Sequence, residues 1–290
     1  MGEISEIRAY STGLDDPELW KPAKHQGKVD KMIYHTHWYS GQSAHAFDKE
    51  ICVYLPYGYD PVNKYDVALL LPGMDMPASC YLRRAHRYSS NLYSVQFANL
   101  LDNAMDKDMI SKAILVTFPY YGATTEGHPD MTLDGNQIVN EIRYDVLPFI
   151  IKKYSTYAGG TDSESISAAR DHFGVFGFSY TSAMIMKFIM PKCIDLFAYY
   201  GASSVFCYSL GEAAKEVNSK LKDYEVKMLY VGCGDRDTAH SQTVDMYKTW
   251  LGLVPDLAEV SELVVLPDTG HDARTYDTAI YNCLSKFFVA

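Results

Sequence analysis

Short apolar runs alternate with amphipathic segments along most of the chain. Residues 67–71 form a continuous apolar run that ends at Pro72-Gly73, which is typical of a strand buried on both faces. Similar runs occupy residues 113–118, 173–176, 196–200, 226–231 and 263–266. Helical periodicity appears between them, at residues 92–105, 138–154, 181–190, 241–251 and 275–288. This alternation predicts an α/β fold with a mostly parallel central sheet and helices on both of its faces.

The N-terminal part of the chain has a different pattern. Residues 31–39 and 50–55 alternate between apolar and polar side chains, which predicts two paired strands joined through residues 41–47. Residues 1–28 lack sustained periodicity and are expected to form an irregular arm or a lid. No repeat or linker interrupts the remainder, so residues 29–290 are expected to form one domain.

The composition excludes several classes of partner. The chain has 36 acidic and 26 basic residues, and its net charge of −10 would repel a phosphate backbone, so nucleic acid is not expected to bind. No apolar run reaches the ~18 residues that a membrane helix requires. The six cysteines lack metal-binding spacing and lie mostly in apolar runs, which favours buried thiols and leaves one long-range disulfide open.

A short motif follows the predicted strand at residues 173–176. Gly177-Phe178-Ser179-Tyr180-Thr181 lies between that strand and a helical segment, the setting in which a sharp turn presents a nucleophilic serine. Gly177 suits this turn because it has no side chain to collide with the folded backbone. Thr181 replaces the second glycine of G-x-S-x-G, which predicts a slightly displaced helix or a small local rearrangement. Ser179 is therefore the candidate nucleophile.

Candidates for the acid and the base follow two later strands. Gly232-Cys233-Gly234-Asp235 comes after residues 226–231, and Gly270-His271-Asp272 comes after residues 263–266. The chain order Ser179, Asp235, His271 is the order of α/β-hydrolase triads. Asp235 is preferred as the acid because it is nearer the strand end, and Asp237 is the alternative.

An acyl-transfer site also needs two backbone N–H donors for the oxyanion. Tyr180, directly after the nucleophile, is expected to supply one. Pro72 has no N–H, so Met74 is the candidate for the other, with Gly73 as the second choice. His35 and His37 share one face of a predicted strand, but no third ligand accompanies them, so no metal is expected.

These motifs resemble those of carbohydrate esterase family 1, which contains feruloyl esterases, acetylxylan esterases and relatives of esterase D. The resemblance covers about residues 29–288 and rests on Val53-Tyr54-Leu55-Pro56-Tyr57-Gly58-Tyr59-Asp60, Leu70-Leu71-Pro72-Gly73, Gly177-Phe178-Ser179, Gly232-Cys233-Gly234-Asp235 and Gly270-His271-Asp272. Two departures stand out, because the family usually has His-Gly at Pro72-Gly73 and a glycine at Thr181. They affect the oxyanion loop rather than the three reactive groups.

The resemblance implies an α/β-hydrolase catalytic domain that hydrolyses esters of plant cell-wall polysaccharide, with ferulate as the leading acyl group and no cofactor. Tyr120 and Tyr121, just past the strand at residues 113–118, are expected to contact the phenolic ring. Such an enzyme is expected to be secreted, its signal peptide being absent from this sequence, and a cytoplasmic location stays open. The alternatives are an esterase or acyltransferase for short acyl groups and a non-catalytic carbohydrate-binding relative. The oligomeric state is not indicated.

Overall fold

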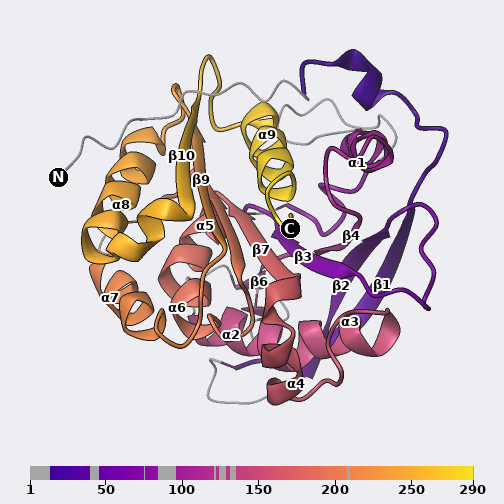
Figure 1. Ribbon diagram of the computed structural model, residues 1–290, viewed down its shortest axis with the longest axis horizontal. Helices are drawn as coiled ribbons and strands as arrows, with labels where there is room; N and C mark the ends of the chain where they lie inside the picture. The colour runs from indigo at the N-terminus through magenta and orange to yellow at the C-terminus, as the bar shows by residue number, and fades with distance from the viewer. Residues whose placement is uncertain are drawn as a thin grey trace.

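An eight-stranded mixed sheet forms the centre of the computed structural model (Figure 1). The structure describes residues 14–39, 46–74, 76–83, 96–120, 122–123, 129–130, 135–207 and 210–289. Across the sheet the strand order is β1-β2-β4-β3-β7-β8-β9-β10. The strands are β1 (Lys28–His37), β2 (Ala46–Leu55), β3 (Asp66–Leu71), β4 (Ala113–Thr117), β7 (Phe173–Phe178), β8 (Tyr199–Ser203), β9 (Met228–Gly234) and β10 (Ser261–Leu266). A separate two-stranded pair is formed by β5 (Gly122–Ala123) and β6 (Pro129–Asp130).

One strand of this sheet, β2, runs opposite to the other seven. β1 pairs with β2 and β2 with β4 in antiparallel fashion, whereas every pair from β4 to β10 is parallel. The predicted pairing of the two N-terminal strands and the predicted mostly parallel sheet are both confirmed. A parallel sheet brings the carboxyl ends of its strands to one edge, where ligands bind in open α/β sheets.

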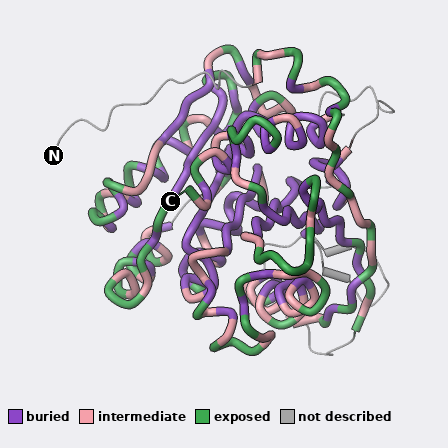
Figure 2. The backbone as a smooth tube through the Cα atoms, turned by 45° about the vertical axis from the view of Figure 1, so that its right-hand side comes forward, coloured by how far each residue is buried: buried purple, intermediate pink, exposed green. Residues whose placement is uncertain are grey.

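Helices cover both faces of the sheet, as the alternating pattern predicts. One face packs against α1 and α9 through a core that includes Leu100 and Ile280. The opposite face packs against a second core that includes Ile142, Ile185 and Trp250, from the remaining large helices (Figure 1). In Figure 2 the strands form a buried interior, and the exposed residues lie on the outer sides of the helices and in the loops.

The helical elements differ in part from the predicted segments. They are η1 (Pro17–Trp20), α1 (Phe97–Asp106), α2 (Gly135–Asn140), η2 (Glu141–Val146), α3 (Leu147–Lys153), α4 (Ser163–Ala168), η3 (Arg170–His172), α5 (Tyr180–Met184), η4 (Ile185–Ile189), α6 (Met190–Lys192), α7 (Gly211–Lys220), α8 (His240–Leu253), η5 (Pro255–Glu259) and α9 (Ala273–Leu284). η2 and η4 are π-helical turns inside longer helical stretches. α7 was not predicted, because its two buried residues, Ala214 and Val217, give too weak an apolar stripe.

Part of the predicted arm lies along α1. The side chain of Asn103 donates to the Leu19 carbonyl at 2.9 Å, and the Gly27 N–H donates to the Asp102 carboxylate at 2.8 Å. Leu19 is fully buried in the core on this face of the sheet. Within the described part of the chain, no helix is long and apolar enough to cross a membrane. None of the six cysteines forms a disulfide.

Candidate active site

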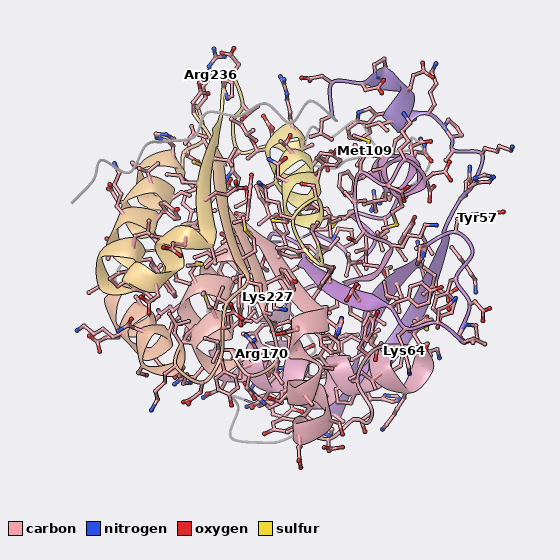
Figure 3. The ribbon with its side chains drawn as sticks, viewed as in Figure 1. Tyr57, Lys64, Met109, Arg170, Lys227 and Arg236 are labelled. Carbon is pink, nitrogen blue, oxygen red and sulfur yellow. The ribbon has the colours of Figure 1, made fainter. Side chains whose placement is uncertain are left out.

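Three reactive side chains lie together beyond the carboxyl ends of parallel strands. Ser179 follows β7, Asp237 lies three residues past β9, and His271 lies five residues past β10. Figure 3 marks this end of the sheet with Arg236, the neighbour of Asp237, whereas Lys227, just before β9, lies toward the other end. The site therefore occupies the edge at which ligands bind in this class of sheet.

Ser179 sits at a strained turn between β7 and α5. Its backbone has φ 59° and ψ −120°, a conformation that residues other than glycine rarely adopt. A Cβ on Gly177 would lie 2.6 Å from the backbone carbonyl of Thr181, so only glycine permits this close approach of helix to strand. The predicted strand-turn-helix arrangement is present, and it holds the serine hydroxyl at the sheet edge.

Thr181 has a specific place in this turn. Its hydroxyl donates to the Leu71 carbonyl at 2.9 Å and accepts the Phe178 N–H at 3.1 Å. The side chain therefore ties the start of α5 to the end of β3 and to the turn itself. A threonine in place of the second glycine thus adds hydrogen bonds at the point where the helix meets the sheet.

A continuous chain of hydrogen bonds links the three side chains. His271 Nε2 lies 2.8 Å from Ser179 Oγ, and His271 Nδ1 lies 3.0 and 3.2 Å from the two carboxylate oxygens of Asp237. With the ring proton on Nδ1, the imidazole donates to Asp237, and Nε2 accepts the serine proton. This geometry gives the hydroxyl an adjacent base and gives the base an orienting carboxylate.

Asp237, and not Asp235, holds the position of the acid, so the preference for Asp235 is wrong. The N–H of Asp235 donates to the Leu266 carbonyl at 2.9 Å, which continues the pairing with β10 and leaves the Asp235 side chain exposed. The chain then turns, with the Asp237 N–H donating to the Gly234 carbonyl at 3.3 Å. That turn places the buried Asp237 carboxylate against His271.

The surroundings of Asp237 keep its carboxylate charged. Burial raises the pKa of Asp237, but hydrogen bonds from His271, from the Ser204 hydroxyl and from the Ala239 N–H outweigh burial, so the pKa lies below its ordinary value. The Ala239 N–H donates to Oδ1 at 2.8 Å. A stable negative charge at this point favours the positively charged form of the His271 imidazole.

Two aromatic rings flank the imidazole of His271. The Phe178 ring stacks on it with a centroid separation of 4.7 Å, and the Phe206 ring approaches at 5.1 Å with an interplanar angle of 62°. Phe206 is 36% exposed, so part of an apolar ring faces solvent beside the reactive groups. Phe206 was not predicted from the sequence; the signal that marks it is its place just after β8, at the same edge of the sheet as the other site residues.

The loop after β3 lies against the turn that carries Ser179. A Cβ on Gly73 would be 3.5 Å from the Phe178 carbonyl oxygen, and the adjacent Met74 is 48% exposed. Tyr180 opens α5, and the N–H groups of the first turn of a helix are directed past its N-terminus. Gly73, Met74 and Tyr180 thus lie on the two segments that the sequence analysis expected to supply the oxyanion donors.

The two tyrosines expected to bind substrate differ in their placement. Tyr120 is buried, and its ring packs against that of Tyr180 with a centroid separation of 5.7 Å. Tyr121 lies outside the described residues. Tyr120 therefore packs against Tyr180, the residue after Ser179, from inside the core rather than standing at an open rim.

The two strand histidines pair with carboxylates. His35 Nδ1 is hydrogen-bonded to Asp48, and His37 Nδ1 lies 3.8 Å from Asp145. Among the residues that the structure describes, no group of three or more histidine, cysteine, aspartate or glutamate side chains could hold a metal ion.

The chain was compared with protein families, known sequences and solved structures. No protein-family model matches the chain. A stretch of 154 residues, 52% of the chain, is 32% identical to endo-1,4-β-xylanase Y from Acetivibrio thermocellus, and the match spans 12% of that protein. Among solved structures, a mutant of the feruloyl esterase module from Clostridium thermocellum complexed with sinapinate matches with a TM-score of 0.76 at 23% identity, over 98% of this chain and 95% of that one.

Two further structures have the same architecture. A CE1 ferulic acid esterase from the anaerobic fungus Anaeromyces mucronatus matches with a TM-score of 0.66 at 18% identity, over 94% of this chain and 95% of that one. S-formylglutathione hydrolase from Staphylococcus aureus matches with a TM-score of 0.55 at 14% identity, over 90% of this chain and 96% of that one. The chain is therefore an α/β-hydrolase in its fold. Within that class, its fold is similar to that of feruloyl esterases.

Proposed function

We propose that this protein is a serine esterase of carbohydrate esterase family 1, with Ser179 as nucleophile, His271 as general base and Asp237 as its orienting acid. The observation that carries the proposal is the hydrogen-bonded chain from Ser179 Oγ through both nitrogens of His271 to Asp237. The strained backbone at Ser179 adds support, because such strain concentrates where it serves a reaction.

The reaction proceeds in two steps. His271 Nε2 takes the proton of Ser179 as Oγ attacks the ester carbonyl, and the tetrahedral intermediate then expels the alcohol, which leaves with that proton. Water attacks the acyl-enzyme with the same proton transfers and releases the acid. We assign the stabilisation of the oxyanion to the N–H of Tyr180 and to an N–H of the loop at Gly73 and Met74.

For the substrate we propose esters of ferulate or a related hydroxycinnamate with plant cell-wall polysaccharide. Two similar structures are described as holding sinapinate and ferulic acid, and both proteins are described as feruloyl or ferulic acid esterases. The partly exposed ring of Phe206 beside His271 offers an apolar surface for an aromatic acyl group. Binding energy from that ring would help to orient the carbonyl toward Ser179.

The experiment compares wild type with Ser179→Ala on methyl ferulate, methyl p-coumarate, acetylated xylan and p-nitrophenyl acetate. Wild type is expected to hydrolyse methyl ferulate and to be labelled at Ser179 by an organophosphate, and the variant is expected to lose about 10⁴-fold or more in turnover. A wild-type protein that is neither labelled nor active would refute the proposed esterase activity. Turnover of acetyl esters alone would refute the proposed hydroxycinnamate substrate but not the esterase activity.

A further inference from the structure

Ser204 lies at the end of β8, between the strand that carries the nucleophile and the strand that carries the acid. In the sheet, Phe178 of β7 is paired with Ser203 of β8, and Ser203 is paired with Gly232 of β9. Ser179 and Ser204 are therefore the first residues beyond a shared row of the sheet. The Ser179 N–H donates to the carbonyl of Ser203, the residue before Ser204, and the Ser204 side chain contacts Asp237.

The hydroxyl of Ser204 is committed to Asp237. Ser204 is fully buried, and its Oγ donates to Asp237 Oδ2. The other oxygen, Oδ1, accepts the Ala239 N–H at 2.8 Å, while His271 Nδ1 faces both oxygens. Donors on two sides thus hold the carboxylate in the plane that meets the imidazole. Removal of the Ser204 hydroxyl would leave one buried oxygen without this donor and would let the carboxylate rotate.

The backbone at Ser204 is strained. Its φ is 58°, in the left-handed region that favours glycine. Hydrogen bonds on either side hold the conformation: the Ser204 N–H donates to the Gly232 carbonyl at 2.8 Å, and the Val205 N–H donates to Thr243 Oγ1 at 2.9 Å. Glycine would adopt this backbone at lower cost, so a serine at this position carries a conformational penalty.

We propose that Ser204 is a positioning residue, which acts on the reaction by fixing the Asp237 carboxylate and, through it, the orientation of His271. This inference rests on the proposed esterase function. It extends the hydrogen-bonded chain by a fourth side chain, from a strand that carries none of the other three.

The test uses two variants at one position and a matched control. Ser204→Ala and Ser204→Gly both remove the hydroxyl, but only glycine relieves the backbone strain. The control is Ser203→Ala, because the Ser203 hydroxyl is also fully buried yet has no hydrogen-bond partner among the residues that the structure describes. Each protein is assayed for kcat and KM on p-nitrophenyl acetate, for the rate of organophosphate labelling of Ser179, and for thermal unfolding.

Both Ser204 variants are expected to lose about ten- to a hundredfold in kcat and in labelling rate, the effect of one hydrogen bond to a charged group, with KM unchanged. Ser204→Gly is expected to be at least as stable as Ser204→Ala and equally slow, and Ser203→Ala is expected to retain wild-type kcat. Wild-type kcat in Ser204→Gly would overturn the proposal, since the effect would then belong to the backbone. Equal losses in Ser203→Ala would overturn it as well. A wild-type protein that is inactive and not labelled at Ser179 would instead refute the proposed esterase function.

Discussion

Asp235 and Asp237 lie two residues apart on the loop after β9, yet only Asp237 reaches His271. The Asp237 side chain is buried and lies 3.0 Å from His271 Nδ1, whereas Asp235 is exposed. Asp237→Asn is expected to lower kcat by about 10³- to 10⁴-fold, because an amide no longer fixes the imidazole in the required tautomer. Asp235→Asn is expected to change kcat by less than about twofold, as for most exposed substitutions. Steady-state kinetics of the two purified variants decide the assignment, which would be reversed if Asp235→Asn were the slower enzyme.

Gly177→Ala tests the close approach of α5 to β7. The added Cβ would meet the Thr181 carbonyl at 2.6 Å, so the turn must open, at a cost of about 1–3 kcal/mol in the free energy of unfolding and with a large loss of kcat. The matched control is Gly252→Ala in α8, where a Cβ meets nothing within 4 Å. That change is expected to stabilise the protein by about 0.5–1 kcal/mol and to leave kcat unchanged. The free energy of unfolding in urea and kcat are measured for both variants. If Gly177→Ala has wild-type values of both, the close approach of α5 to β7 is not required.

Phe206→Ala tests the surface proposed for the acyl ring. The variant is expected to lose about tenfold in kcat/KM on methyl ferulate and less on p-nitrophenyl acetate, because the smaller substrate has no aromatic acyl group to contact this ring. The ratio of the two values removes any shared effect of the Phe206 ring on His271. Tyr57→Ala is the control, since Tyr57 is 54% exposed and lies away from Arg236 and the site edge (Figure 3). A ratio unchanged by Phe206→Ala would place the acyl group elsewhere.

The cysteines are expected to differ in reactivity. Cys207 is partly exposed, whereas the other five are buried. Burial raises the pKa of the Cys52 thiol to about 11 and that of Cys193 to about 12, so neither forms the reactive thiolate at pH 8. Titration of the native protein with a disulfide reagent should therefore detect a single fast-reacting thiol, which Cys207→Ser removes. In the denatured protein all six thiols should react. A fast thiol that persists in Cys207→Ser would contradict this order of exposure.

Much of this molecule is predictable because its strands are apolar runs and its reactive residues follow them. The run before His271 ends with β10 at Leu266, and the run before Ser179 ends two residues before β7 does, so both residues could be placed from the sequence. The acid could not be placed in this way. Distance from a strand end does not show which side chain a turn carries inward, and the turn from Gly234 to Asp237 depends on backbone hydrogen bonds that the residue types do not reveal.

The same reasoning explains why Ser204 was missed. β8 was predicted at residues 196–200 because its apolar residues lie there, but the strand runs from Tyr199 to Ser203. Its second half, Gly201-Ala202-Ser203, consists of small residues that give no apolar run although they are buried. Because the predicted strand ended three residues too early, Ser204 did not fall directly after a predicted strand, where site residues are expected.

Ser179, Asp237 and His271 follow β7, β9 and β10, which are joined in one sheet through β8. The distances between these side chains therefore depend on the register of the strands. A slip of one residue between two neighbouring strands would move a side chain by about 3.3 Å and turn it to the other face of the sheet. The contact of 2.8 Å between His271 and Ser179 does not survive such a shift. For the proposed esterase, we therefore expect a change of strand register to lower kcat before the chain loses its secondary structure, even when the change begins far from Ser179.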